Sequence, residues 1–107
     1  MPVAELSPSE VLQRWPDRAN VVLLDVREPA EVAVAAVAGA VHIPMGEIPA
    51  RLAELDPERP IVVMCHLGGR SRRVAEFLAS RGFREVFNLR GGIDAWSVEV
   101  DPDIPRY

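Results

Sequence analysis

Residues 61–71, IVVMCHLGGRS, join a short apolar run to a loop that contains two adjacent glycines. The run at 61–64 predicts a strand that is buried on both faces of a sheet. Gly68 and Gly69 permit backbone angles that other residues resist, so the chain can turn tightly before a helix begins near Ser71. A buried strand, a tight turn and a helix are the parts of a βα unit, which indicates a parallel sheet.

The same alternation of apolar runs and helical patterns extends over the rest of the chain. Further strands are predicted at residues 21–24, 41–43 and 86–87, and helices at 8–15, 29–38, 48–55, 71–81 and 93–97. Gly82 suits a left-handed cap at the end of the fourth of these helices. The pattern predicts an α/β fold with a mostly parallel sheet and helices on both faces, followed by an extended surface tail from residue 98.

Length and composition indicate one globular domain over residues 1–107. The chain is 49% hydrophobic and 26% charged, which is ordinary for a folded domain. No targeting or membrane-spanning pattern is present, so a cytoplasmic protein is expected. A net charge of -4 disfavours nucleic acid and membrane surfaces as partners. A single cysteine and two histidines provide neither a disulfide nor the usual zinc ligands, and we expect no metal or cofactor.

Cys65 follows the buried strand at 61–64, where parallel sheets place their ligand sites. A lone cysteine is usually a small buried apolar residue, but the glycines and polar side chains after it are unsuited to an apolar core. Backbone N–H groups of a curled loop and the start of the next helix can together bind an anion. We therefore expect Cys65 to ionise readily and to act as a nucleophile, with Arg70 binding an anionic substrate group.

Four motifs in order resemble the rhodanese family of sulfurtransferases, over nearly the whole chain. One motif is the loop at residues 65–71, called the active loop. The other three are Asp25-Val26-Arg27-Glu28 after the strand at 21–24, residues 39–44 (GAVHIP) and residues 91–96 (GGIDAW). The resemblance implies a three-layer rhodanese-like domain with a mostly parallel five-stranded sheet. One departure is Ala35-Ala36, where family members commonly carry Gly-His.

The resemblance also implies a reaction and its partners. Cys65 would take a sulfane sulfur from a small anionic donor such as thiosulfate, and form a persulfide. The sulfur would then pass to cyanide or to a thiol, with a sulfur-carrier protein as one candidate acceptor. The persulfide would be held by the loop and its first helical residue, namely His66, Leu67, Gly68, Gly69, Arg70 and Ser71.

Two alternatives remain open from the sequence. A non-catalytic rhodanese-like module for binding or sulfide sensing would share the fold, although inactive relatives generally lose the cysteine. A cysteine phosphatase or arsenate reductase is less favoured, because their pockets need five residues between cysteine and arginine and this loop has four. For the remaining polar residues we expect structural roles: Asp25 and Arg27 as supports, His42 as a hydrogen-bonded strand residue and Asp94 in a turn.

Overall fold

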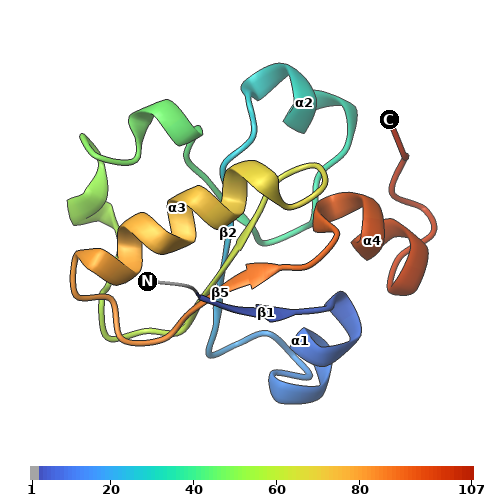
Figure 1. The fold of residues 1–107 in the computed structure, drawn as a ribbon. Helices are drawn as coiled ribbons and strands as arrows, with labels where there is room; N and C mark the ends of the chain where they lie inside the picture. The colour runs from blue at the N-terminus through green and yellow to red at the C-terminus, as the bar shows by residue number, and fades with distance from the viewer. Residues whose placement is uncertain (1–2) are drawn as a thin grey trace.

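The computed structural model describes residues 3–107, which form a five-stranded sheet with helices on both of its faces (Figure 1). The strands are β1 (Ala4–Leu6), β2 (Val22–Asp25), β3 (Val41–His42), β4 (Ile61–Met64) and β5 (Val86–Leu89). Their order across the sheet is β1-β5-β4-β2-β3, and each neighbouring pair is parallel. The predicted α/β class is confirmed.

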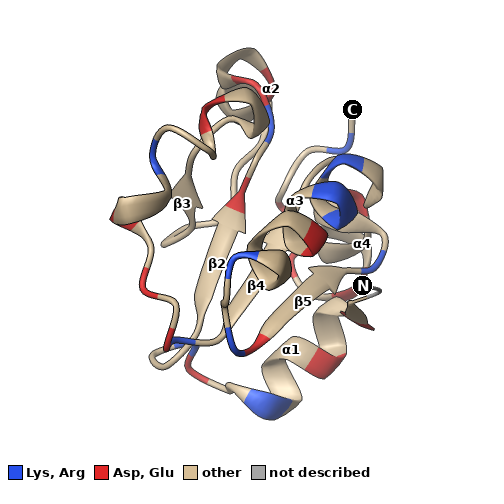
Figure 2. Cartoon of the chain, turned by 60° about the vertical axis from the view of Figure 1, so that its left-hand side comes forward, with Lys and Arg blue, Asp and Glu red and all other residues tan. Residues whose placement is uncertain are grey.

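Two hydrophobic cores lie on the two faces of the sheet. On one face, α3 (Gly69–Ser80) packs together with residues of the segment that holds two short 3-10 helices, η1 (Met45–Glu47) and η2 (Leu52–Glu54). On the other face lie α1 (Pro8–Arg14) and α4 (Gly92–Glu99). α2 (Pro29–Val34) follows β2 at one end of the sheet (Figure 2). Within residues 3–107 there is no helix with the length and apolar character needed to cross a bilayer.

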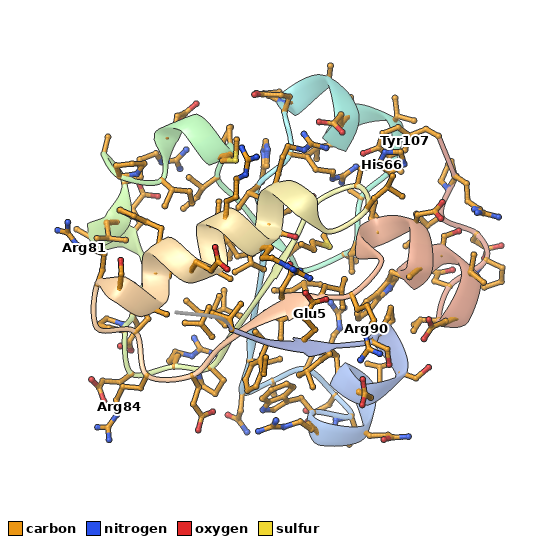
Figure 3. The ribbon with its side chains drawn as sticks, viewed as in Figure 1. Glu5, His66, Arg81, Arg84, Arg90 and Tyr107 are labelled. Atoms are coloured by element: carbon orange, nitrogen blue, oxygen red, sulfur yellow. The ribbon has the colours of Figure 1, made fainter. Side chains whose placement is uncertain are left out.

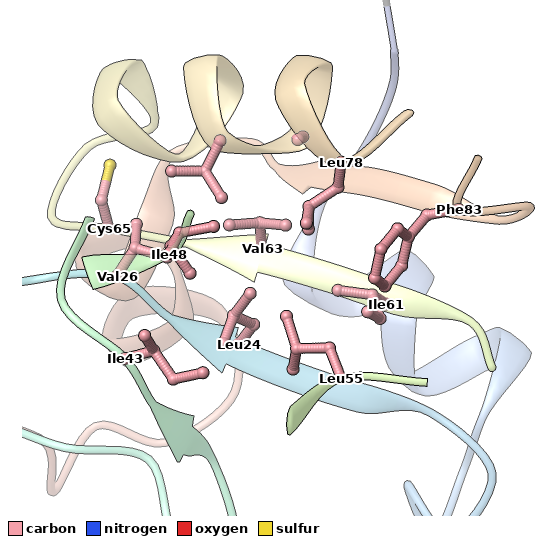
Figure 4. Close-up of a cluster of buried hydrophobic side chains, with 12 residues drawn as sticks. Leu24, Val26, Ile43, Ile48, Leu55, Ile61, Val63, Cys65, Leu78 and Phe83 are labelled. Atoms are coloured by element: carbon pink, nitrogen blue, oxygen red, sulfur yellow. The ribbon is translucent and has the colours of Figure 1, made fainter. Parts of the chain in front are cut away.

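The central strand β4 supplies both cores, because successive strand residues point to opposite faces. Ile61 and Val63 belong to the α3 side, whereas Val62 and Met64 belong to the α1 and α4 side. All four are fully buried. Cys65 continues this alternation into the α3 side, where Figure 4 shows it at the end of the cluster. The strand therefore directs the cysteine towards the start of α3.

The predicted helix at 48–55 is wrong. The structure forms η1 and η2 instead, with a turn between them. The backbone departs from α-helical geometry at Arg51, with φ of -111° and ψ of 16°, so the turns on either side do not join into one helix. The apolar pattern had a different cause, since Ile48 and Leu55 are both buried against the α3 side of the sheet.

The end of α2 and the packing of the tail also differ from the sequence interpretation. α2 ends at Val34 rather than near residue 38, because Ala35 adopts an extended conformation and its carbonyl accepts a hydrogen bond from the Arg27 side chain at 2.7 Å. The tail after α4 does not simply lie on the surface. Ile104 is buried, and its carbonyl accepts a hydrogen bond of 2.6 Å from the Ser97 hydroxyl. The tail is thus fastened to α4.

Candidate active site

Cys65 lies directly after β4, at the carboxyl edge of the central strand. The residue is only 1% exposed, and its sulfur points away from the apolar cluster and towards the first turn of α3 (Figure 4). The backbone N–H of Gly68 donates to Sγ at 3.1 Å, and Ser71 Oγ lies 3.3 Å from it. The Cys65 side chain therefore packs against apolar residues, whereas its sulfur faces polar groups of Gly68 and Ser71, which together are called the polar cap.

The polar cap favours the charged form of the thiol. Burial alone raises the pKa of Cys65, because a buried thiolate loses its hydration. The Ser71 hydroxyl and the backbone amides of Ser71, Gly68 and Leu67 oppose that effect, and they leave the pKa below its ordinary value. Reactive cysteines typically have a lowered pKa, often because they lie at a helix N-terminus, and the thiolate is their nucleophilic form.

Asn88 on β5 holds this cap in place, and sequence reasoning missed it. The Ser71 hydroxyl lies 2.5 Å from Asn88 Oδ1, and Asn88 Nδ2 donates to the Gly68 carbonyl at 3.1 Å. A hydroxyl carries one proton, so Ser71 donates either to Asn88 or to a Cys65 thiolate. The available signal was an amide residue within an otherwise apolar strand, where a polar side chain needs a buried partner.

The start of α4 supports the loop from the opposite side. The N–H groups of Ile93 and Asp94 donate to the carbonyls of Cys65 and His66 at 2.9 and 3.2 Å. Gly92 makes this approach possible, since a Cβ atom there would lie 2.5 Å from the Cys65 carbonyl oxygen and 2.4 Å from that of His66. The segment at 91–96 is therefore part of the structure that supports the loop.

The two loop glycines have different roles, which corrects the sequence interpretation. Gly68 has a φ of +117° and directs its N–H towards the sulfur. Gly69 is the first residue of α3 with ordinary helical geometry, and a Cβ atom there would have nothing within 4 Å. Only Gly68 of this pair needs the conformational freedom of glycine.

Arg70 is held by an acidic residue from α2. Its Nη1 and Nη2 atoms donate to the two carboxylate oxygens of Glu31 at 2.6 and 2.9 Å. Figure 2 shows acidic positions on α2 and basic positions at the start of α3 towards the same end of the molecule. The Arg70 guanidinium lowers the pKa of Glu31 to about 2, so the pair is charged at neutral pH.

The tail reaches the same place through Tyr107. Its hydroxyl donates to Glu31 Oε2 at 2.9 Å and accepts a hydrogen bond from Arg27 Nη1 at 2.8 Å. Its ring stacks on the His66 imidazole with 4.0 Å between centroids, and the two labelled side chains lie together in Figure 3. Leu67, the next loop residue, is 64% exposed. His66 and Leu67 thus lie on the outer side of the loop.

Asp25 and Arg27 form a buried ion pair at the neighbouring strand end. Arg27 is fully buried, and its Nε and Nη2 atoms donate to Asp25 at 3.0 and 2.7 Å. His42 Nε2 lies 2.7 Å from the Arg27 carbonyl, as expected for a hydrogen-bonded strand residue. The pair connects β2, α2 and the tail.

Comparison with known proteins agrees with this geometry. A model of the rhodanese-like domain matches residues 7–99. The chain belongs to this family.

Two curated relatives and one solved structure illustrate the similarity to other rhodanese-like proteins. A sulfurtransferase of Allochromatium vinosum is 39% identical over 95 residues, covering 89% of each chain. Rhodanese-like/PpiC domain-containing protein 12, chloroplastic, of Arabidopsis thaliana is 38% identical over 99% of this chain, which spans only 38% of that longer protein. A rhodanese-related protein of Thermoplasma volcanium has a TM-score of 0.83 at 26% identity, with 97% and 99% of the two chains covered.

Of the loop residues that the sequence singled out, Gly68 and Ser71 contact the Cys65 sulfur, whereas His66 and Leu67 lie on the outer side of the loop. Arg70 is paired with Glu31, which is the main cause of the raised pKa of Arg70. Gly69 supplies only the first helical residue. Glu31, Asn88 and Tyr107 were not predicted, because each comes from a different element and meets the loop only in the folded chain.

Proposed function

We propose that this chain is a sulfurtransferase that carries sulfur on Cys65. The observation that supports it most directly is the sulfur atom at the end of β4, which faces the Gly68 amide and the Ser71 hydroxyl. Donors of this kind stabilise a thiolate, and they can equally stabilise the terminal sulfur anion of a persulfide. The related sulfurtransferase of Allochromatium vinosum supports the same assignment.

The reaction has two steps when thiosulfate is the donor. The Cys65 thiolate attacks the outer sulfur of thiosulfate, a new S–S bond forms, and the old S–S bond breaks with its electron pair leaving on sulfite. Cyanide or a thiolate then attacks the outer sulfur of the persulfide, which returns Cys65 to the thiolate and releases thiocyanate or an acceptor persulfide. No net redox reagent is needed, and the sequence of steps is a ping-pong scheme.

Arg70 is the residue that we expect to bind the anionic group of the donor. Its side chain is 35% exposed, and its pKa is raised mainly by the hydrogen bonds with Glu31 and to a smaller extent by the charge of the Cys65 thiolate. The guanidinium can present two parallel N–H groups to a sulfonate or carboxylate group.

Intact mass measurement tests the first step. Incubation of the reduced protein with thiosulfate should add the mass of one sulfur atom, and dithiothreitol should remove it. The Cys65→Ser variant keeps the size of the side chain and should gain no mass. Addition of cyanide to the loaded protein should release one thiocyanate.

Failure of the parent protein to gain sulfur, from thiosulfate and from an organic persulfide alike, would contradict the proposal. That result would favour the alternative in which the domain is a non-catalytic binding or sensing module.

A further inference from the structure

The carboxylate of Glu31 is already paired with Arg70, the arginine that we expect to bind an anionic donor. Arg70 uses two N–H groups for this ion pair, and the Glu31 side chain is only 22% exposed. An incoming anion must therefore displace Glu31 or bind to a guanidinium whose charge is already balanced. Both routes weaken anion binding relative to a free arginine.

Glu31 is held in this position by contacts that do not involve the loop. Its Oε1 atom accepts a hydrogen bond of 3.1 Å from the backbone N–H of Glu28 at the start of α2. Its Oε2 atom accepts from the Tyr107 hydroxyl at 2.9 Å, and that hydroxyl is itself fixed by the buried Arg27. These contacts orient the carboxylate before any donor arrives.

We propose that Glu31, positioned by Tyr107, determines the charge of the sulfur donors that this site accepts. The inference rests on the proposed sulfurtransferase function. Glu31 lowers the affinity for strongly anionic donors, so thiosulfate, a dianion, is a weak donor and organic persulfides of lower charge are the favoured class. Tyr107 acts as a positioning residue, because it contacts Glu31 and His66 rather than the sulfur.

A pair of alkylating reagents tests the charge effect without requiring sulfur transfer. Iodoacetate and iodoacetamide are similar in size and react with the same thiolate, but only iodoacetate is an anion. In Glu31→Gln, the rate of Cys65 alkylation by iodoacetate relative to iodoacetamide should rise about five- to tenfold, because Arg70 loses its counter-charge. Glutamine keeps a carbonyl oxygen that can accept the hydrogen bond from the backbone N–H of Glu28.

Two further variants test whether the change in the reagent ratio comes from the charge of Glu31 beside Arg70. Glu58→Gln removes the same charge and another arginine ion pair, that with Arg84, and it should leave the reagent ratio unchanged. Tyr107→Phe keeps the ring that stacks on His66 but removes the hydroxyl, and it should raise the ratio about twofold. Equal acceleration of both reagents in Glu31→Gln would show steric cover instead of charge selection, and would overturn the inference.

Steady-state kinetics give the second readout. In Glu31→Gln, the KM for thiosulfate should fall about five- to tenfold with little change in kcat, whereas the KM for an organic persulfide should change less than twofold. If the parent forms a persulfide but neither the reagent ratio nor this KM responds to Glu31→Gln, the inference fails and the proposed function stands. If the ratio responds but the parent never gains sulfur, the proposed function fails and the charge selection by Glu31 stands.

Discussion

Cys65 has a buried side chain whose sulfur is nevertheless surrounded by donors. Apolar surroundings by themselves would keep the thiol neutral, as they do for most buried cysteines. Here the amide of Gly68 and the hydroxyl of Ser71 lie at 3.1 and 3.3 Å from Sγ, and together with neighbouring amides they outweigh the cost of burial. The result is a thiol with a lowered pKa inside an apolar cluster.

The pH dependence of Cys65 alkylation follows from this balance. A thiol with a lowered pKa becomes thiolate at a lower pH, so reaction with iodoacetamide should rise with pH and reach its midpoint at a lower pH than for an unperturbed cysteine. Ser71→Ala removes one donor to the thiolate, and it should shift the midpoint upwards by about one pH unit.

Ser80→Ala provides the control, since the Ser80 hydroxyl is exposed on the far end of α3 and bonds to the Phe77 carbonyl. An unshifted midpoint in Ser71→Ala would mean that the amides alone stabilise the thiolate. A midpoint is independent of modest losses in stability, so the test separates ionisation from folding.

At the scale of elements, the active loop is held between the start of α3 and the start of α4. The first turn of α3 supplies Ser71, and the first turn of α4 supplies the N–H groups that bind the carbonyls of Cys65 and His66. Both helices begin after a glycine with positive φ, at Gly68 and Gly91. Two helix N-termini therefore converge on one short stretch of backbone.

Gly92→Ala tests the support from α4. A Cβ atom at Gly92 would overlap with the carbonyl oxygens of Cys65 and His66, so the loop or the helix must move. We expect a loss of about 1–3 kcal/mol in the free energy of unfolding and slower reaction of Cys65 with iodoacetamide. Urea denaturation and alkylation rates measure the two effects.

Gly46→Ala is the matched control, because a Cβ atom there has nothing within 4 Å and Gly46 has no positive φ. It should change stability by less than about 1 kcal/mol. Unchanged alkylation in Gly92→Ala would show that the contact between α4 and the loop is not needed to form the thiolate site.

At the scale of the molecule, a chain of polar contacts connects the interior to the outer side of the loop. Arg27 joins Asp25 on β2, the carbonyl of Ala35 after α2 and the hydroxyl of Tyr107 in the tail. Hydrogen bonds with Asp25 and Tyr107 outweigh the desolvation of Arg27 and raise its pKa. Among residues 3–107, no buried side-chain nitrogen or oxygen lacks a hydrogen-bond partner.

Arg27→Met should destabilise the whole domain. It leaves the Asp25 carboxylate buried without its partner, which costs about 3–5 kcal/mol in the free energy of unfolding. Arg84→Met removes an arginine whose side chain is 71% exposed and paired with the exposed Glu58, and it should change that free energy by less than about 0.5 kcal/mol. Urea denaturation of both variants measures the difference, and equal effects would contradict the role assigned to the buried pair.

The pattern of apolar residues was enough to predict the class of fold and the position of the loop. The strand at 61–64 and the helix that ends before Gly82 were confirmed because their patterns are local and strongly periodic. β1 was missed, because three residues at the edge of a sheet carry too little pattern to stand out. The segment at 48–55 was misread, because its apolar spacing reflects burial of separate turns and not a continuous helix.

The sequence by itself determined the α/β architecture and placed one thiol, two glycines and an arginine after the central strand, since backbone propensity and apolar periodicity act over short distances. Only the tertiary structure decided what surrounds that thiol. Asn88, Gly92, Glu31 and Tyr107 are distant from Cys65 along the chain, and parallel strand order with a returning tail brings them to the same loop. Contacts between distant segments depend on packing, and no local pattern specifies them.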